Sequence, residues 1–242
     1  MFLTVASKSL LNRKGSVAMT LMAISVAIFV LLGIEHVRQQ ARDSFASTVS
    51  GVDLIVGAKT GSLNLLLYSV FRIGSPTDNI KWETFEQVVA DPAVSWAIPI
   101  SLGDSHEGYR VVGTTSAYFD HFSYGKKRRI EFINGVPFEG IFDAVLGSEV
   151  AKTLGYAVNS KIVLAHGLAT TSFSLHDNKP FTVVGILAPT GTPVDQTIHV
   201  PLQGIDAMHS DWPQGPSNLT VKSRADPGAN PAKPESITAF ML

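Results

Sequence analysis

The sequence predicts an α+β protein in which one N-terminal membrane helix precedes a mixed α/β domain outside the membrane. Residues 17–34 contain no charged side chain, and no other segment of the 242 residues is as long and as apolar. Downstream, strand and helix patterns interleave without a strict strand–helix–strand rhythm, which favours mixed or antiparallel pairing. Cysteine is absent, so the domain has to be stable through its hydrophobic core without disulfides.

The apolar run is long enough to cross a bilayer. Its 18 residues approach the roughly 20 that a hydrocarbon core about 30 Å thick requires. A cleaved signal peptide has a shorter apolar core, of about 7–15 residues, and needs a small-residue cleavage site, which residues 35–40 (EHVRQQ) lack. We therefore interpret residues 16–46 as a retained anchor with a helical extension. The anchor side chains expected to face lipid are Val17, Leu21, Ile24, Ile28, Leu31 and Ile34.

Basic residues next to the anchor indicate its orientation. They are Lys8, Arg13 and Lys14 before the helix and Arg38 and Arg42 after it. Lysine and arginine favour the cytoplasmic side of a membrane, and the amino terminus adds one more positive charge before the helix. We therefore expect residues 1–15 to be cytoplasmic and the domain to lie on the opposite side.

Turn residues and apolar patterns divide the rest of the chain into short elements. The expected strands cover residues 52–56, 94–102, 109–113, 161–165, 181–187, 197–200 and 218–223. The expected helices cover residues 63–72, 82–89, 116–122, 149–154 and 201–209, and 103–108 is expected to be a loop. This order favours two subdomains, split near residues 122–142, within one domain over residues 47–223. Residues 224–235 are rich in proline, alanine and charge, so we interpret residues 224–242 as a linker.

Composition and spacing argue against several classes of chemistry. A net charge of −1 does not suit nucleic-acid binding, and the basic run 126–129 is expected in a solvated surface loop. The stretch 57–61 (GAKTG) lacks the glycines with which a phosphate loop surrounds its ligand. The histidines show no metal-ligand spacing and are expected to be ordinary core or surface residues. We expect no catalytic residue, no metal and no cofactor.

Two stretches leave alternatives open. Residues 104–107 (DSHE) place serine, histidine and carboxylates together, so a membrane-anchored hydrolase that uses Ser105 and His106 is one alternative, and a polar hairpin loop is the other. The apolar stretch 63–71 is too short to span a bilayer. It packs on the core, lies at the membrane interface, or binds a partner as part of an adaptor. Its candidate interface residues are Leu65, Leu66, Tyr68 and Phe71.

Several stretches, in this order, resemble a known family. Residues 9–14 (SLLNRK) precede the anchor, 145–155 (VLGSEVAKTLG) lead to 159–164 (NSKIVL), and 181–187 (FTVVGIL) lead to 191–196 (GTPVDQ). They are similar to segments of the MacB/FtsX-like class of ABC transporter permeases, which have a MacB-like periplasmic core domain. Within the second stretch, Ser148 is expected to cap a helix that Gly155 ends.

The resemblance implies a permease subunit with four helices in the bacterial inner membrane. Its periplasmic domain would couple ATP hydrolysis in a separate subunit to export or to work in the periplasm, and it would not be an enzyme itself. The implied partners are a cytoplasmic ABC ATPase, a second permease copy, the lipid bilayer, and a periplasmic or outer-membrane protein. The sequence stops at Leu242, where the resemblance places a second membrane helix. We therefore expect a fragment of a longer permease or a truncated gene product.

Overall fold

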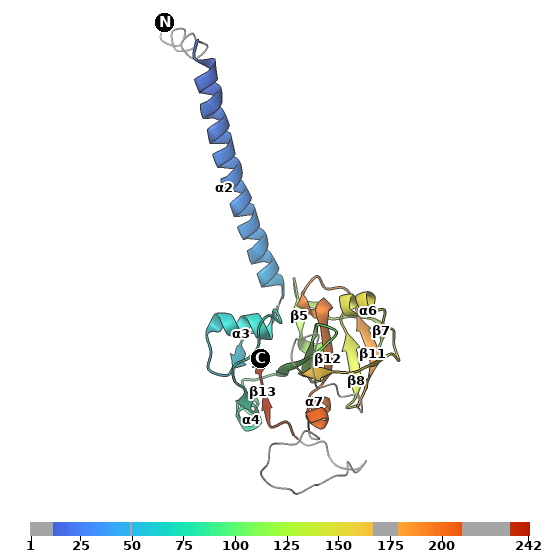
Figure 1. The fold of residues 1–242 in the computed structure, drawn as a ribbon. Helices are drawn as coiled ribbons and strands as arrows, with labels where there is room; N and C mark the ends of the chain where they lie inside the picture. The colour runs from blue at the N-terminus through green and yellow to red at the C-terminus, as the bar shows by residue number, and fades with distance from the viewer. Residues whose placement is uncertain (1–11, 49, 167–178, 210–232) are drawn as a thin grey trace, which may run out of the picture. The chain divides into compact units, whose positions relative to one another are not determined.

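The structure is a computed structural model that describes residues 12–48, 50–166, 179–209 and 233–242 (Figure 1). Contacts within the chain divide it into two compact units, Met1–Ala46 and Ser47–Leu242. The first unit consists mainly of a long helix. The second holds the strands and the remaining helices that the structure describes.

Helix α2 extends over Lys14–Thr48, 35 residues without a break (Figure 1). Proline is absent from this segment, and its leucine, methionine and alanine residues have high helix propensity. Thr20 donates its hydroxyl hydrogen to the Ser16 carbonyl at 2.9 Å, so this polar group is satisfied within the apolar stretch. Glu35 and Arg38 form an ion pair at 3.2 Å just after the stretch ends. The predicted helical extension beyond residue 34 is confirmed.

One mixed sheet of ten strands forms the centre of the second unit. Its main order is β1-β14-β3-β4-β12-β8-β11-β7, with β10 beside β3 and β9 beside β11. The strands are β1 (Ile55–Gly57), β3 (Ile98–His106), β4 (Tyr109–Thr114), β7 (Phe132–Gly135), β8 (Asp143–Leu146), β9 (Lys161–Ile162), β10 (Ala165–His166), β11 (Phe181–Leu187), β12 (Thr197–Pro201) and β14 (Ala239–Met241).

The strand pairing confirms the predicted mixed α+β class. Strand β12 is parallel to β4 and β11 is parallel to β8, whereas the other pairs within the described sheet are antiparallel. Figure 1 shows β8, β11 and β12 side by side. The ten-stranded sheet lies within one compact unit, Ser47–Leu242, and a division of that unit into two subdomains remains a prediction.

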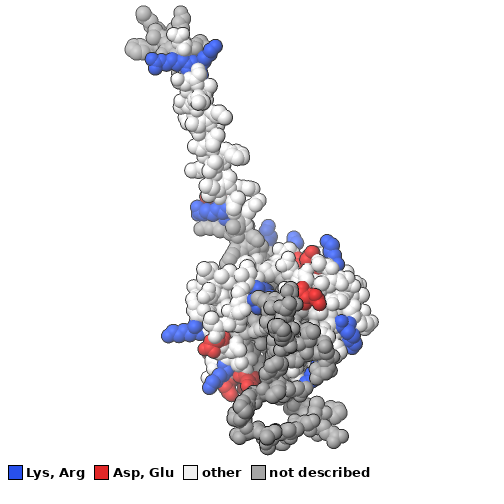
Figure 2. Space-filling model, in the orientation of Figure 1, with Lys and Arg blue, Asp and Glu red and all other residues white. Residues whose placement is uncertain are grey.

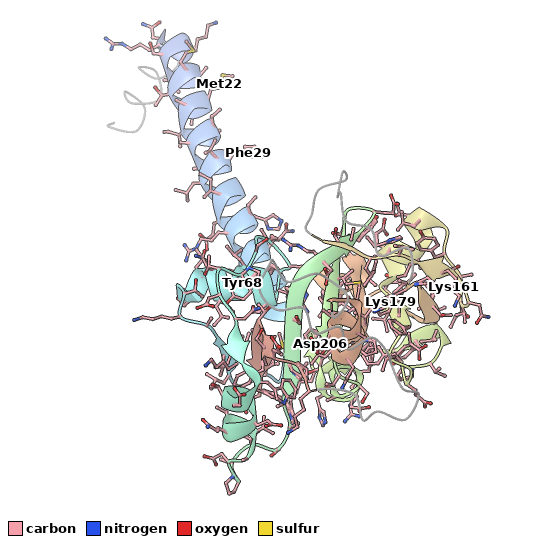
Figure 3. All side chains as sticks on the ribbon, turned by 60° about the horizontal axis from the view of Figure 1, so that its bottom comes forward. Met22, Phe29, Tyr68, Lys161, Lys179 and Asp206 are labelled. Atoms are coloured by element: carbon pink, nitrogen blue, oxygen red, sulfur yellow. The ribbon has the colours of Figure 1, made fainter. Side chains whose placement is uncertain are left out.

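Short helices and two small ladders surround the sheet. The helices are α3 (Ser62–Ser69), α4 (Trp82–Val89), α5 (Ala117–His121), α6 (Ser148–Leu154), the 3-10 helix η1 (Pro193–Gln196) and α7 (Leu202–His209). The ladders pair β2 (Ile80–Lys81) with β13 (Ser236–Ile237), and β5 (Ser123–Tyr124) with β6 (Arg128–Arg129). Lys179, just before β11, donates to the Ala207 carbonyl in the last turn of α7 at 2.5 Å, in the region labelled in Figure 3. This contact places a cation at the negative end of the helix.

The central strands are buried on both faces. In β4, Val111 and Val112 are both fully buried but belong to different apolar clusters, and Val145 and Leu146 of β8 divide in the same way. Successive side chains of a strand point to opposite faces, so the sheet has one core on each side. A third, smaller cluster is built around Phe240. Burial on both faces explains why these strands are nearly continuous apolar runs in the sequence.

The predicted linker over residues 224–242 is wrong at its C-terminal end. Residues 210–232 lie outside the described part of the chain, and they include the strand expected over 218–223. The segments Ser236–Ile237 and Ala239–Met241 are strands, and β14 lies between β1 and β3 with Ala239, Phe240 and Met241 fully buried. The linker prediction rested on the composition of residues 224–235, and the short strands β13 and β14 follow that stretch directly.

Two local predictions also need correction. The stretch 103–108 is not an extended loop: β3 continues to His106, and a two-residue turn at Glu107 and Gly108 leads into β4. Both turn residues have positive φ, 49° and 84°, which is the geometry of tight hairpins. Ser148 does not cap α6, because the capping position is Gly147 and no side chain bonds there. Gly155 does end the helix in a left-handed conformation, as expected.

Candidate functional site

The α2 surface between residues 14 and 40 has the composition of a membrane-spanning helix. The most apolar 18-residue window of this stretch has a mean hydropathy of 2.6, and none of that window is buried against other residues. Of the predicted anchor residues, Val17 is half-buried and Leu21, Ile24, Ile28, Leu31 and Ile34 are more than half exposed. Figure 2 shows this part of the helix free of charged residues between its ends, and Met22 and Phe29 project from it in Figure 3. An apolar surface of this extent requires a cover, and the lipid of a bilayer provides one.

The α3 segment only partly matches the predicted interface. Tyr68 is buried in the core, and Leu65, Leu66 and Phe71 are half-buried against the same cluster. Leu63 and Ile73 are the exposed apolar side chains in this stretch, 62% and 58% accessible. Leu65 and Tyr68 are three residues apart, so their side chains lie on the same face of the helix. This spacing is the sequence signal that could have identified them as core-facing residues. An interface at α3 remains a prediction.

The geometry of residues 104–107 does not favour the hydrolase alternative. Both ring nitrogens of His106 already have partners: Nδ1 lies 2.7 Å from the Val163 carbonyl oxygen and Nε2 lies 2.9 Å from the Tyr156 hydroxyl. The carbonyl can only accept, so Nδ1 carries the hydrogen and Nε2 accepts from Tyr156. Ser105 is the preceding residue of the same strand, so its side chain points to the opposite face. His106 is therefore a structural link between β3 and the segment before β10, and it is not placed to activate Ser105.

Within the described ranges, no group of three or more histidine, aspartate and glutamate side chains could hold a metal ion. His36 hydrogen-bonds to Gln40 on the surface of α2, and His121 stacks on Trp96 with ring centroids 5.2 Å apart. His176 lies outside the described residues. These surroundings agree with the sequence-based expectation of ordinary surface histidines for His36 and His121.

His199 departs from that expectation. It lies fully buried in the middle of β12, its ring 4.7 Å from that of Tyr118. Its ring nitrogens form no hydrogen bond of good geometry with the described residues, and the nearby backbone of Val145 provides only a weak contact. Complete burial, together with the nearby positive charge of Arg72, lowers the pKa of His199 to about 3. The imidazole is therefore neutral at physiological pH. Only its place inside an apolar strand hinted at this in the sequence.

The family-like motifs form the scaffold around the sheet. Asp195 holds the loop before η1: its carboxylate accepts hydrogen bonds from the backbone N–H groups of Thr190 and Gly191, each at 2.8 Å. Thr192 caps η1 by accepting from the Val194 N–H at 3.3 Å. Gly147, before α6, packs directly against the carbonyls of Val194 and Asp195. The two motif stretches 145–155 and 191–196 therefore pack against each other and stabilise one corner of the domain.

Comparison with known proteins gives one family match. The family model of the MacB-like periplasmic core domain matches residues 17–236. Comparison with curated proteins gives no match.

Comparison with solved structures also finds similar chains, among them the following two. The periplasmic region of MacB from Actinobacillus actinomycetemcomitans is 10% identical, with 79% of this chain and 75% of that one covered and a TM-score of 0.42. The extracellular domain of the noncanonic ABC-type transporter YknZ from Gram-positive bacteria is 11% identical, with 68% and 73% covered and a TM-score of 0.39. The family match spans most of the sequence, from the apolar helix to β13, and this chain therefore belongs to the family of the MacB-like periplasmic core domain.

Proposed function

We propose that this chain is the anchored extracytoplasmic part of an ABC transporter permease, with helix α2 in the inner membrane and the unit Ser47–Leu242 in the periplasm. The observation that carries the proposal is covalent continuity. A helix apolar enough to cross a membrane leads without a break in the chain into a domain of a periplasmic family. A movement of such a helix would be passed directly to the residues that follow it.

In this proposal the domain relays motion and has no chemistry of its own. Its sheet is buried on both faces, and a packed core of this kind transmits displacement with little deformation. The energy would come from ATP hydrolysis in a separate cytoplasmic subunit of the ABC class, and two permease copies would act together. The work done outside would be export of a substrate or action on a periplasmic or outer-membrane partner.

The ATPase partner can be tested by site-specific crosslinking in cells. A photo-crosslinking amino acid is placed at Arg13, just before the apolar stretch, and in a second protein at Lys152, which is exposed on α6. The proposal expects ultraviolet light to join the Arg13 probe to a protein with ABC-type nucleotide-binding motifs. The Lys152 probe, on the other side of the membrane, should not capture that protein.

The proposal would be contradicted if the Arg13 probe captured no ATPase under conditions in which the protein is membrane-bound. It would equally fail if the Lys152 probe captured the same ATPase with the same yield. Addition of a non-hydrolysable ATP analogue to permeabilised cells provides a further check, because it should change the yield of the specific adduct.

A further inference from the structure

A cavity of about 370 Å³ opens at the surface of the second unit, away from α2 in the sequence and unrelated to the relay role proposed above. Three segments form its walls: the stretch after α3, the turn between β3 and β4, and the helix η1. Its lining residues are Phe71, Arg72, Ile73, Gly74, Gly108, Tyr109, Arg110, Pro193 and Gln196. Among these side chains, the two arginines are the only charged ones, so the wall carries two positive charges and no negative one.

Arg110 is an unusual residue for the middle of a sheet. It belongs to β4, with Ser105 of β3 on one side and Thr197 of β12 on the other, and only 8% of its surface is exposed. Its guanidinium donates from Nη2 to the Gly74 carbonyl. A guanidinium has five N–H groups, and the Gly74 carbonyl is the one acceptor that the described residues supply. The backbone contact fixes the side chain in place and leaves donors for a ligand.

Arg72 faces the same cavity from a strained backbone. Its φ of 60° lies in the left-handed region, which a bulky side chain rarely adopts. Its Nη1 donates to the Ser69 carbonyl at the end of α3. Arg72 lies in the turn that ends α3, where the Ile73 N–H donates to the Leu67 carbonyl at 2.9 Å, and helices commonly end with a residue in this conformation. Arg72 and Arg110 both belong to the lining of this cavity.

The two positive charges are close enough to affect one another. Burial lowers the pKa of Arg110, and the neighbouring charge of Arg72 lowers it further. Burial also lowers the pKa of Arg72, and its interaction with the neighbouring Tyr118 hydroxyl opposes that shift. Within the described ranges, neither arginine forms an ion pair with a carboxylate, since the ion pairs found there join Arg38 to Glu35 and Lys233 to Glu86. Two partly desolvated cations without a counter-charge favour an anion from solution.

We propose that this cavity binds a phosphate group between Arg72 and Arg110. Planar guanidinium groups bind phosphate oxygens through paired, charge-assisted hydrogen bonds, and a phosphate dianion matches the charge of two arginines. The cavity volume lies within the range of small-molecule sites, about 300–1,000 Å³, so there is room for more than the phosphate. Phe71, Ile73 and Pro193 supply apolar contacts for the body of a phosphate ester. The ligand is therefore a phosphomonoester, either a soluble one or the headgroup of a lipid.

The test is calorimetric titration of the full chain in dodecyl maltoside micelles with inorganic phosphate, at constant ionic strength and against chloride. The proposal expects saturable binding that the variants Arg72→Gln and Arg110→Gln each weaken roughly tenfold or more. The matched control is Arg129→Gln, which removes an exposed arginine of β6 and should leave phosphate binding unchanged. Circular dichroism shows whether each variant is folded.

Arg110→Gln also removes the tether to Gly74, so Arg110→Lys and Arg72→Lys are measured beside it. They keep the charge but lose the paired donor geometry, and they should bind phosphate with intermediate affinity. Competition by glycerol 3-phosphate would assign a soluble ester, and competition by short-chain phosphatidic acid alone would assign a lipid headgroup. Phosphate binding no tighter than that of chloride, or equal in wild type and all arginine variants, would show that the arginines only tether the backbone and would overturn the proposal.

Discussion

Gly147 shows how a single residue can carry a family-like motif for structural reasons. A Cβ atom at this position would lie 2.3 Å from the Val194 carbonyl oxygen and 2.4 Å from that of Asp195. Both are backbone atoms of the η1 region, which cannot move aside without disturbing the Asp195 loop. Glycine is required here by close packing and not by φ, which has an ordinary value of −64°.

We therefore expect Gly147→Ala to lower the free energy of unfolding by about 1–3 kcal/mol, the usual range for overpacking. Urea denaturation of the full chain in micelles, followed by tryptophan fluorescence, measures it. The control is Gly103→Ala in β3, where no atom lies within 4 Å of the added Cβ, and the change should stay within about 0.5 kcal/mol. Equal effects of the two substitutions would refute the packing argument.

His199 predicts a specific dependence of stability on pH. Its pKa is lowered from 6.5 to about 3 in the folded protein. Between these two values the unfolded chain binds a proton that the folded chain does not, so the free energy of unfolding decreases as the pH falls. The contribution of one such group is at most about 1.4 kcal/mol per pH unit.

The comparison is between wild type and His199→Phe, unfolded by urea at several pH values between 7 and 4. The variant should lose a large part of the pH dependence, whatever its absolute stability. His121→Gln, a change at an exposed histidine, should keep the wild-type slope. A variant slope equal to that of wild type would mean that His199 does not govern the acid sensitivity.

At the scale of elements, β14 is the most informative strand. It lies between β1 and β3, although it comes from the last residues of the sequence. Phe240 is fully buried, and its ring contacts that of Phe85 edge-on with centroids 5.1 Å apart. This segment therefore belongs to the folded domain.

We expect Phe240→Ala to destabilise the domain by about 3–5 kcal/mol, as large-to-small changes in a core do. The same denaturation assay measures it, with Val136→Ala as control, because Val136 is 59% exposed and its truncation should matter little. If Phe240→Ala unfolded no earlier than the control, β14 would not be part of the cooperative unit.

Helix α3 is an element whose hydrophobicity left several interpretations open. Its sequence allowed packing on the core or an interface at Leu65, Leu66, Tyr68 and Phe71, and the structure places most of this surface against the core. The residues on the solvent side are fewer, with Leu63 and Ile73 the most exposed apolar ones. Apolar residues in a short helix can form an exposed interface, but they can equally form the face that packs the helix against the core.

For the molecule as a whole, the sequence predicted the local elements well and the long-range ones poorly. The strand Phe181–Leu187 was predicted with the observed bounds, because alternation and flanking turns are local signals. The continuation of β3 to His106 was missed because the polar stretch 104–107 resembles a loop although it forms a tight hairpin with β4. The insertion of β14 was missed for another reason, because it depends on partners distant in sequence, which no local pattern reveals. The cavity between Arg72 and Arg110 has the same origin, since its residues come from three separate segments.

The proposed membrane arrangement can be measured directly, because the chain contains no cysteine. Single cysteines are introduced as Asn12→Cys, before the apolar stretch, and as Lys152→Cys, on the exposed side of α6. Intact bacterial spheroplasts are then treated with a membrane-impermeant maleimide. The account predicts labelling at position 152 and protection at position 12 until the membrane is opened with detergent. Labelling at position 12 with protection at position 152, or recovery of the protein in the soluble fraction, would contradict it.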